Sequence, residues 1–333
     1  MKKGHRIVSV RLVLILLIGL PGVALPQNFV FRYGHSQPPQ APRSQSMLFF
    51  KDTLERKAGG RVQVENYFSG TLGNEREMMD MVATGVLQGT RGGLFIDANP
   101  KFVLFMLPFL VEDWDQAIRL VNSDLAREIG SGARQNGFHI PATGISQGFR
   151  AHTNSVRRIR TPSDLAGLKM RVPPQEIYVR TASAFGASPQ EMPASDIYSA
   201  LKTGVLDGQD NPPSNIWDYN IFEVQKFMTV THYSTGPDPF IVDLAWYGRL
   251  PGDLQRIFDD VAVQTMVYSD ALNRRLESEY INQLGDHLQV DILSSAELES
   301  FRELVRPVYQ SYVERGIISN EDIRRAREIA VGD

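Results

Sequence analysis

The sequence predicts an α/β protein with two domains. The chain has 333 residues, of which 42% are hydrophobic and 22% are charged, which suits a globular protein of about two domains. Stretches with the alternating pattern of strands are interleaved with helical stretches along most of the chain, as in an α/β fold. An unbroken amphipathic stripe at residues 253–284 predicts a helix about 48 Å long, which would outspan one domain of ~150 residues and cross both.

Each element is expected from a local pattern. Alternation of apolar and polar residues indicates strands, whereas a 3.6-residue apolar period, caps such as Asn74 and Thr161, and terminal glycines indicate helices. Strands are expected at residues 29–35, 61–67, 139–143, 149–153, 168–172, 205–211, 227–232 and 240–246. Helices are expected at residues 44–57, 74–82, 177–185, 196–202, 253–284, 296–316 and 321–329. Because no flexible linker marks a boundary, we expect the chain to cross between the domains several times.

Residues 1–27 have the pattern of a secretory signal peptide. Four basic residues precede a short apolar run that glycine and proline interrupt; an uncleaved N-terminal anchor is the alternative. Cleavage would remove four positive charges from a chain whose formal net charge is −3. The absence of cysteine excludes disulfides, cysteine-ligated metals and thiol catalysis. An exported protein of this size without disulfides suits a bacterial periplasm.

Composition and motifs argue against several classes of function. An acidic chain lacks the excess cationic charge that nucleic acids attract, and no phosphate-binding loop, dinucleotide motif or metal-ligand spacing is found. We therefore expect no nucleic acid, metal or cofactor. Residues 144–148 match the nucleophile elbow of serine hydrolases, but the residues after them alternate like a strand, where an elbow needs a helix. An exported hydrolase that uses Ser146 is the alternative to a binding protein.

Arg171 is the binding residue that the local pattern indicates most directly. It lies near the end of the strand expected at residues 168–172, just before Pro173 and Pro174, and open α/β sheets bind ligands at the carboxyl ends of their strands. A guanidinium offers a planar fork of donors that matches a carboxylate. The alternative is a surface arginine or a structural ion pair.

Ten stretches, taken in order, resemble the solute-binding proteins of tripartite ATP-independent periplasmic (TRAP) transporters, the DctP-like family. They are residues 33–36, 70–77, 107–110, 148–150, 161–173, 185–189, 196–201, 204–212, 222–227 and 231–232. The resemblance implies a two-lobe periplasmic-binding-protein fold with crossing strands and one long helix spanning both lobes. Lobe I is expected to hold residues 28–148 and 237–270, and lobe II residues 149–236 and 271–333, with the helix at residues 253–284 shared.

The resemblance also implies a function. Such a protein captures an organic acid by closing its lobes around it, and delivers the acid to TRAP membrane permease subunits that use an ion gradient. We therefore expect a monomeric periplasmic protein that is not an enzyme. A binder that presents its ligand to a membrane sensor is a further alternative.

The resemblance assigns three residues to the ligand carboxylate. In the family, the arginines that correspond to Arg171 and Arg150 and the asparagine that corresponds to Asn211 form this clamp. Two arginines around one carboxylate leave a surplus positive charge, which a dicarboxylate ligand or a nearby acid such as Asp210 would balance. Further candidate ligand contacts are His35, Tyr198, Trp217, Tyr219 and Asp238.

Two departures from the family pattern bear on specificity. Members that bind sialic acid carry a glutamate where this chain has Gly92-Gly93, and an aromatic wall residue where it has Ala194. Sialic acid is therefore not the expected ligand. The glycines would leave room near Arg91 for a different or bulkier ligand.

Overall fold

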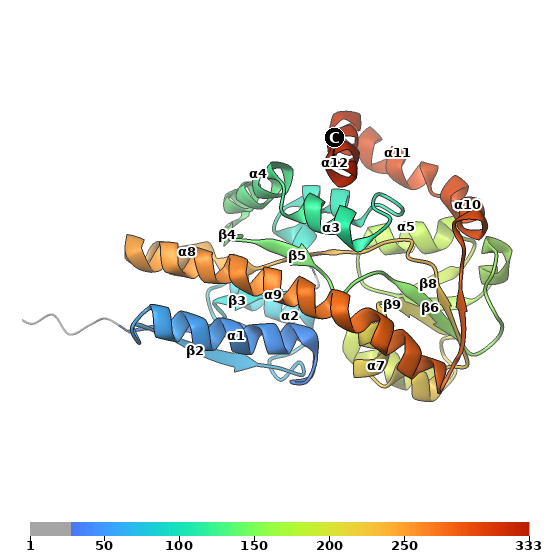
Figure 1. The fold of residues 1–333 in the computed structure, drawn as a ribbon, viewed down its shortest axis with the longest axis horizontal. Helices are drawn as coiled ribbons and strands as arrows, with labels where there is room; N and C mark the ends of the chain where they lie inside the picture. The colour runs from blue at the N-terminus through green and yellow to red at the C-terminus, as the bar shows by residue number, and fades with distance from the viewer. Residues whose placement is uncertain (1–27, 93, 333) are drawn as a thin grey trace, which may run out of the picture.

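Two mixed sheets, each flanked by helices, form two lobes that lie side by side along the long axis of the molecule (Figure 1). This computed structural model describes residues 28–92 and 94–332. The predicted signal peptide, residues 1–27, lies outside the described residues. Within those residues, no helix combines the length and apolar character needed to cross a bilayer.

The sheet of lobe I has the strand order β2-β1-β3-β12-β4. Strand β1 pairs in parallel with β2 on one side and with β3 on the other, and β12 runs antiparallel between β3 and β4. Four phenylalanines, Phe31, Phe50, Phe240 and Phe258, pack beneath it with ring centroids 4.9 to 6.1 Å apart. The bounds are β1 (Phe29–Gly34), β2 (Val62–Tyr67), β3 (Gly89–Thr90), β4 (Phe138–His139), β12 (Ile241–Asp243), α1 (Pro42–Lys57), α2 (Glu75–Ala83), α3 (Trp114–Val121), α4 (Asp124–Gly132) and α8 (Leu244–Gly248).

The sheet of lobe II has the order β13-β10-β6-β9-β7-β8. Strand β7 runs parallel to β9, and β6 runs antiparallel to β9. The carboxyl ends of β7 and β9 therefore meet the amino end of β6 at one edge of the sheet. The bounds are β6 (Ala151–Asn154), β7 (Lys169–Val172), β8 (Ser188–Glu191), β9 (Gly208–Asn211), β10 (Phe227–Val230), β13 (Gln289–Ile292), α5 (Glu176–Ala184), α6 (Ile197–Lys202) and α7 (Pro213–Asp218).

The chain crosses between the lobes through a small two-stranded sheet. Its strands β5 (Thr143–Ile145) and β11 (Pro237–Pro239) are antiparallel, and each leads from one main sheet toward the other. The backbone N–H of Ser146 donates to the Gly236 carbonyl at 2.8 Å, and that of Arg150 donates to the Ser234 carbonyl at 2.9 Å. The two crossings are thus held together as a pair, as the expectation of crossing strands requires.

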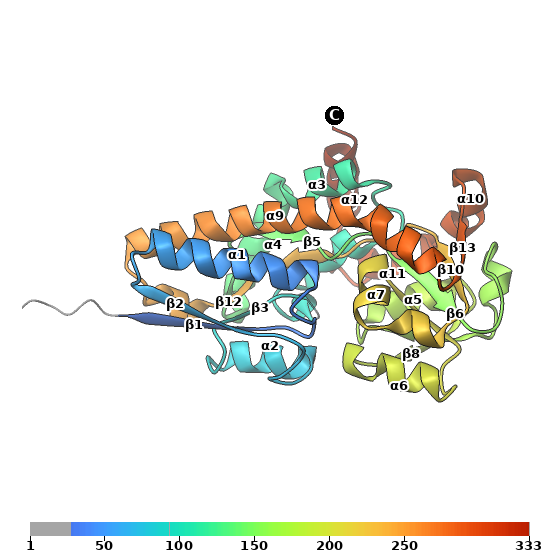
Figure 2. The same ribbon diagram turned by 60° about the horizontal axis from the view of Figure 1, so that its bottom comes forward.

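The long helix is present as α9 (Gly252–Gly285), 34 residues in length, close to the predicted 253–284. It packs against α1 in lobe I, along β5 and against α7 in lobe II, and Figure 2 shows it running across both lobes. Its residues Leu254 and Phe258 belong to the core of lobe I, and Leu284 to the core of lobe II. The single helix α9 therefore contributes side chains to the cores of both lobes.

Some predicted elements differ from the structure. The strand expected at residues 240–246 ends at Asp243, because the Asp243 side chain accepts from the N–H of Ala245 at 2.9 Å and so caps α8. The helix expected at residues 296–316 is interrupted at Val305 and forms α10 (Ser295–Leu304) and α11 (Arg306–Glu314). Pro307 in the first turn of α11 has no N–H to continue the hydrogen bonds of α10. The last helix, α12 (Asn320–Val331), packs on α3. Short 3-10 helices occupy Phe95–Asp97, Pro100–Met106, Ala133–Asn136, Pro162–Leu165, Ala194–Asp196 and Ile221–Val224.

Candidate functional site

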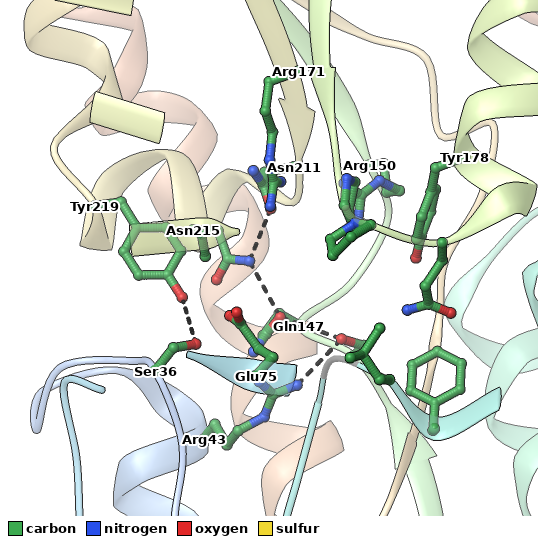
Figure 3. Close-up of a pocket in the computed structure, with 17 residues that line it drawn as sticks. Ser36, Arg43, Glu75, Gln147, Arg150, Arg171, Tyr178, Asn211, Asn215 and Tyr219 are labelled. Atoms are coloured by element: carbon green, nitrogen blue, oxygen red, sulfur yellow. Dashed lines mark hydrogen bonds between the residues drawn. The ribbon is translucent and has the colours of Figure 1, made fainter. Parts of the chain in front are cut away.

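A cavity of about 80 Å³ lies between the lobes and is shown in Figure 3. Its lining includes the sheet edge of lobe II, the first turns of α1 and α2 in lobe I, and the crossing between β5 and β6. A second cavity of about 380 Å³ adjoins it and shares Ser36, Glu75, Ala194 and Tyr219 with it. The polar residues that line the first cavity are Ser36, Arg43, Glu75, Ser146, Gln147, Arg150, Arg171, Gln175, Tyr178, Asn211, Asn215 and Tyr219.

Arg171 reaches the cavity from β7 and is buried. Its Nε donates to the Met192 carbonyl at 2.9 Å, and no carboxylate in the described part of the chain forms an ion pair with it. Burial, and then the nearby charge of Arg150, lower the pKa of Arg171 to about 10. The guanidinium is thus still charged near neutral pH, and it faces the cavity without an acidic partner.

Arg150, in contrast, is already neutralised. Its Nε lies 2.6 Å from Oδ2 of Asp210, its Nη2 donates to the Asp210 carbonyl at 2.6 Å, and its guanidinium lies 4.5 Å from the ring centroid of Tyr178. Burial would raise the pKa of Asp210, but the charge of Arg150 outweighs it and keeps that pKa below its usual value. The surplus charge of two arginines could be balanced by a dicarboxylate ligand or by a nearby acid. In this site the nearby acid Asp210 balances Arg150.

Asn211 lies at the end of β9, beside both arginines. Its Oδ1 accepts from Nδ2 of Asn215 at 3.1 Å, and its Nδ2 donates to the side chain of Gln209. The topology explains the convergence, because Asn211 pairs with Ala151, the residue after Arg150, and β9 lies beside β7. The three predicted clamp residues are therefore brought together at one sheet edge.

Of the other predicted contact residues, Tyr219 also lines this cavity, whereas Tyr198, His35, Trp217 and Asp238 do not. Tyr198 lines the adjoining cavity, where its hydroxyl donates to Glu223 at 2.7 Å. His35 is buried, and its ring nitrogens lie 2.8 Å from the Tyr33 hydroxyl and 2.7 Å from the Ser44 hydroxyl. Burial, followed by the charges of two arginines, lowers its pKa well below the usual value. Neither His35, Trp217 nor Asp238 is part of the lining; Trp217 stacks on Phe222, and Asp238 is buried in an ion-pair cluster.

Several lining residues were missed by sequence reasoning. Glu75 stands inside residues 70–77, a stretch that carries the family resemblance, and that stretch could have indicated it. Arg43 follows a proline-rich turn with no motif around it. Asn215 lies in the first turn of a helix, where polar residues are ordinary. Gln147 lies within residues 144–148, whose pattern drew attention to Ser146 instead.

Gly92, one of the two glycines at the position of the glutamate of sialic acid binders, does not open room for a larger ligand. Gly92 has φ +84°, and a Cβ atom there would lie 2.6 Å from Nη1 of Arg43. The Arg43 guanidinium therefore fills the space, and the Arg91 side chain beside it is 0% exposed. The prediction of free room near Arg91 is therefore wrong at Gly92. Gly93 lies outside the described residues.

Ser146 is not part of a nucleophile elbow. It lies between β5 and β6, two strands, so no helix follows it to present its hydroxyl. Its Oγ lies 3.2 Å from Nη2 of Arg43 and 3.3 Å from the Gln147 side chain, and no histidine contacts it in the part of the chain described. Across that same part, no three histidine, aspartate or glutamate side chains are grouped as a metal site would require.

Asp270, on α9, is a buried acid behind the cavity. Its Oδ1 accepts from the N–H of Ile145 in β5 at 2.8 Å, and burial raises its pKa to about 8. The folded protein thus keeps this proton up to about pH 8, while the unfolded chain releases it near pH 4. The free energy of unfolding therefore falls as pH rises through this interval.

Replacement of Asp270 by asparagine should remove this pH dependence. Asparagine keeps the acceptor for Ile145 but cannot ionise, so Asp270→Asn should be more stable than the wild type at pH 7.5, and this difference should be much smaller at pH 4.5. Urea unfolding of both proteins at the two pH values measures the difference. The same difference at both pH values would show that Asp270 does not titrate in this way.

Comparisons with known proteins identify the family of this chain. The model of DctP, the bacterial extracellular solute-binding protein family 7, matches residues 33–315. The sialic acid-binding periplasmic protein SiaP of Vibrio cholerae is 30% identical over 80% of this chain and 83% of its own length. The C4-dicarboxylate-binding periplasmic protein DctP of Rhodobacter capsulatus is 26% identical over 90% of this chain and 91% of its own.

Solved structures match over nearly the whole chain. A TRAP periplasmic solute-binding protein from Desulfovibrio salexigens with bound orotic acid aligns with a TM-score of 0.86 at 26% identity, covering 92% of this chain and 99% of the other. One from Polaromonas bound to D-erythronate aligns with a TM-score of 0.85 at 26% identity, covering 90% and 98%. The chain therefore belongs to family 7 of the bacterial extracellular solute-binding proteins, the DctP family, and is a solute-binding protein of the TRAP type rather than an enzyme.

Proposed function

We propose that this protein captures a small organic acid in the periplasm, as a monomer, and hands it to the permease subunits of a TRAP transporter. The observation that carries the proposal is Arg171, a buried guanidinium that faces a cavity between two lobes and has no acidic partner in the described part of the chain. A buried charge without a partner is costly, and a ligand carboxylate would supply the partner.

The rest of the sheet edge suits one carboxylate. Arg150 is neutralised by Asp210, so it can donate hydrogen bonds without adding net charge. The amide of Asn211 can donate to the same group. Arg171 then provides the charge and the fork of donors. The three residues together form a carboxylate clamp with a net charge of about +1.

The solutes bound in similar structures support this class of ligand. The Desulfovibrio protein holds orotic acid, the Polaromonas protein D-erythronate, and a Haemophilus influenzae protein L-gulonate, all of them small carboxylic acids. Gly92 and Ala194, at the positions that depart from the sialic acid binders, argue against that larger acid here. The acidic balance of the chain argues against nucleic acid as a partner.

A thermal-shift screen of organic acids, together with mass spectrometry of the acid carried through purification, tests the proposal. A ligand present at 100 times its Kd should stabilise the protein by about 2.7 kcal/mol. Amines and neutral sugars of similar size serve as controls and should give no shift. If no carboxylic acid stabilises the protein and none is recovered from it, the proposal is wrong.

Binding should also close the lobes. The cavity is lined from both lobes, so a ligand gains its full set of contacts only when they approach each other. Direct contacts already link the lobes in this structure: the Ser36 and Tyr219 hydroxyls lie 3.3 Å apart, and Gln37 donates to Asn215 at 2.5 Å. The hinges are expected at residues 148–150 and 235–239, where the chain crosses.

Small-angle scattering measures this closure. Saturation with the cognate acid should lower the radius of gyration of the wild type. The Arg171→Ala variant at the same acid concentration is the matched control and should show no change. An unchanged radius in saturated wild type would show that capture does not proceed by lobe closure.

A further inference from the structure

A series of buried polar side chains links lobe I, the cavity and the interior of lobe II. Each member donates a hydrogen bond to the next, and each is at most 7% exposed. The members of this amide series, in order, are Gln37, Asn215, Asn211, Gln209, Thr153 and Gln225. Only the first belongs to lobe I. The clamp residue Asn211 lies in the middle of the series.

The inner end of the amide series has a fixed direction. Nε2 of Gln225 donates to the Val224 carbonyl at 2.9 Å, and a carbonyl can only accept. Oε1 of Gln225 therefore accepts from the Thr153 hydroxyl at 3.0 Å. Because that hydroxyl has no second proton, it must accept from Nε2 of Gln209, which lies 2.8 Å away and opposite it in the pairing of β6 with β9. The oxygen of Gln209 is then left to accept from the amide nitrogen of Asn211.

The end at the cavity imposes the same direction. A guanidinium can only donate, and the Gln147 amide is oriented with its oxygen toward Arg43, accepting at 2.8 and 2.9 Å. The same oxygen accepts from Nε2 of Gln37 at 2.5 Å. That nitrogen also donates to Oδ1 of Asn215 at 2.5 Å, and Nδ2 of Asn215 donates to Oδ1 of Asn211 at 3.1 Å (Figure 3). Both ends therefore fix the orientation of the amide between them.

This orientation decides which atom of Asn211 can meet a ligand. A carboxylate only accepts hydrogen bonds, so the nitrogen of the amide attracts it and the oxygen repels it. The terminal torsion of asparagine is broad and roughly two-fold, so an amide without neighbours could present either atom. Here Asn215 occupies the oxygen, and Gln209 takes one N–H of the nitrogen. The second N–H has no acceptor in the described part of the chain, which leaves it for a carboxylate held by Arg171.

Gln37 joins the amide series from the other lobe. It lies between β1 and α1 in lobe I and is 0% exposed, whereas Asn215 lies on α7 in lobe II. Their contact therefore requires the lobes to be close together. Hydrogen bonds in a buried series strengthen one another. Closure thus stabilises the binding orientation of Asn211, and an oriented Asn211 stabilises the contact between the lobes.

We infer that the amide series positions the carboxylate clamp, with Thr153 and Gln209 holding Asn211 in its binding orientation and Gln37 coupling that orientation to lobe closure. The inference rests on the proposed function, since Asn211 must bind the ligand carboxylate. Thr153, Gln209 and Gln37 do not line the cavity. They are positioning residues, which act on the ligand through Asn211 and Asn215.

The ligand-free protein tests the amide series itself. Thr153→Val keeps the shape of the side chain but removes both roles of its hydroxyl, whereas Thr153→Ser keeps both. In NMR spectra, Thr153→Val should speed the exchange of the Asn211 side-chain amide protons with water by about tenfold or more. Thr153→Ser should leave this rate within about twofold of the wild type. Equal rates in all three proteins would show that the series does not hold Asn211.

Calorimetry tests the effect on binding. The probes are orotate, D-erythronate and L-gulonate, the acids bound in similar structures, and the acid that binds most tightly is used for the variants. Thr153→Val should weaken its binding about tenfold, and Thr153→Ser should restore the wild-type affinity. In an Asn211→Ala background, Thr153→Val should have no further effect, because it acts through Asn211. A loss that persists in that background would contradict the inference.

Gln37→Met tests the coupling to closure. Methionine has a similar length but no donor for Asn215, so dissociation of the same acid should be about tenfold faster while association changes little, as measured by stopped-flow displacement. An unchanged dissociation rate would show that Gln37 has no such role. Thermal melting checks that each variant is folded, and Gln37→Met, at the surface between the lobes, provides the test if Thr153→Val does not fold.

The two kinds of measurement separate this inference from the proposed function. If none of the acids binds the wild type but the exchange rates change as expected, the proposed function is wrong and the amide series still holds Asn211. If an acid binds but neither Thr153→Val nor Gln37→Met affects it, the inference is wrong and the carboxylate clamp stands.

Discussion

Arg171→Ala should weaken binding of the organic acid by about 30-fold to several thousand-fold, or about 2–5 kcal/mol. The ligand carboxylate would remain in a buried site beside Arg150, whose charge Asp210 already neutralises. Its desolvation would then be only partly offset by the hydrogen bonds of Asn211 and Arg150. Isothermal titration calorimetry with the acid identified in the thermal-shift screen measures the loss.

Two further variants make the Arg171 test specific. Arg171→Lys should recover only a small part of the affinity, because an ammonium keeps the charge but lacks the planar fork that fits a carboxylate. Lys169→Ala, on the same strand but exposed, should bind as the wild type does. A loss of less than threefold for Arg171→Ala would contradict its assignment to the carboxylate.

Asp238→Ala should lower the free energy of unfolding by about 3–5 kcal/mol, because it leaves a buried arginine without its carboxylate. The Arg91 side chain is 0% exposed and cannot turn to water, and its Nη2 lies 2.6 Å from Oδ2 of Asp238. Its remaining donor contacts are to the neutral hydroxyls of Ser46 and Ser269. Urea unfolding measures the change in the free energy of unfolding.

An exposed ion pair provides the matched control for Asp238. Asp253 forms a contact with Arg61 at 2.5 Å in which the two side chains are 46% and 37% exposed. Asp253→Ala should leave the unfolding midpoint essentially unchanged, since solvent screens such pairs. If Asp238→Ala lowers the free energy of unfolding no more than Asp253→Ala does, Asp238 does not stabilise the buried cluster that it forms with Arg43 and Arg91.

The elements that sequence could predict were those with a strong local signal. The uninterrupted stripe of α9 predicted its length to within a residue at each end, and Asn74 caps α2 as expected, accepting from the N–H groups of Arg76 and Glu77. In contrast, β8 (Ser188–Glu191) and β13 (Gln289–Ile292) were missed. Both are four-residue strands at the edges of their sheet. The sequence of β8, Ser-Pro-Gln-Glu, lacks the apolar alternation that identifies strands, whereas β13 alternates but is too short to stand out directly after a long helix.

The candidate site was predictable to the extent that it lies on strands with a recognisable pattern. Arg171 could be placed from the end of an apolar strand, and the resemblance supplied Arg150 and Asn211. The charge state of Arg150 could not be deduced, because its pairing with Asp210 depends on the register between β6 and β9. The residues that line the cavity from lobe I were harder still to predict from the sequence. His35 and Asp238 were expected as ligand contacts, but the structure buries both behind the lining and brings Arg43 forward in their place.

The shared helix α9 has a consequence for how the molecule loses its structure. Leu254 and Phe258 pack in the core of one lobe and Leu284 in the core of the other, within a single hydrogen-bonded helix. If one lobe opened completely, part of α9 would lose its packing, and the remaining lobe would lose support along one face. The two cores should therefore be thermodynamically linked, and we expect the chain to unfold as one cooperative unit rather than as two separate folding units.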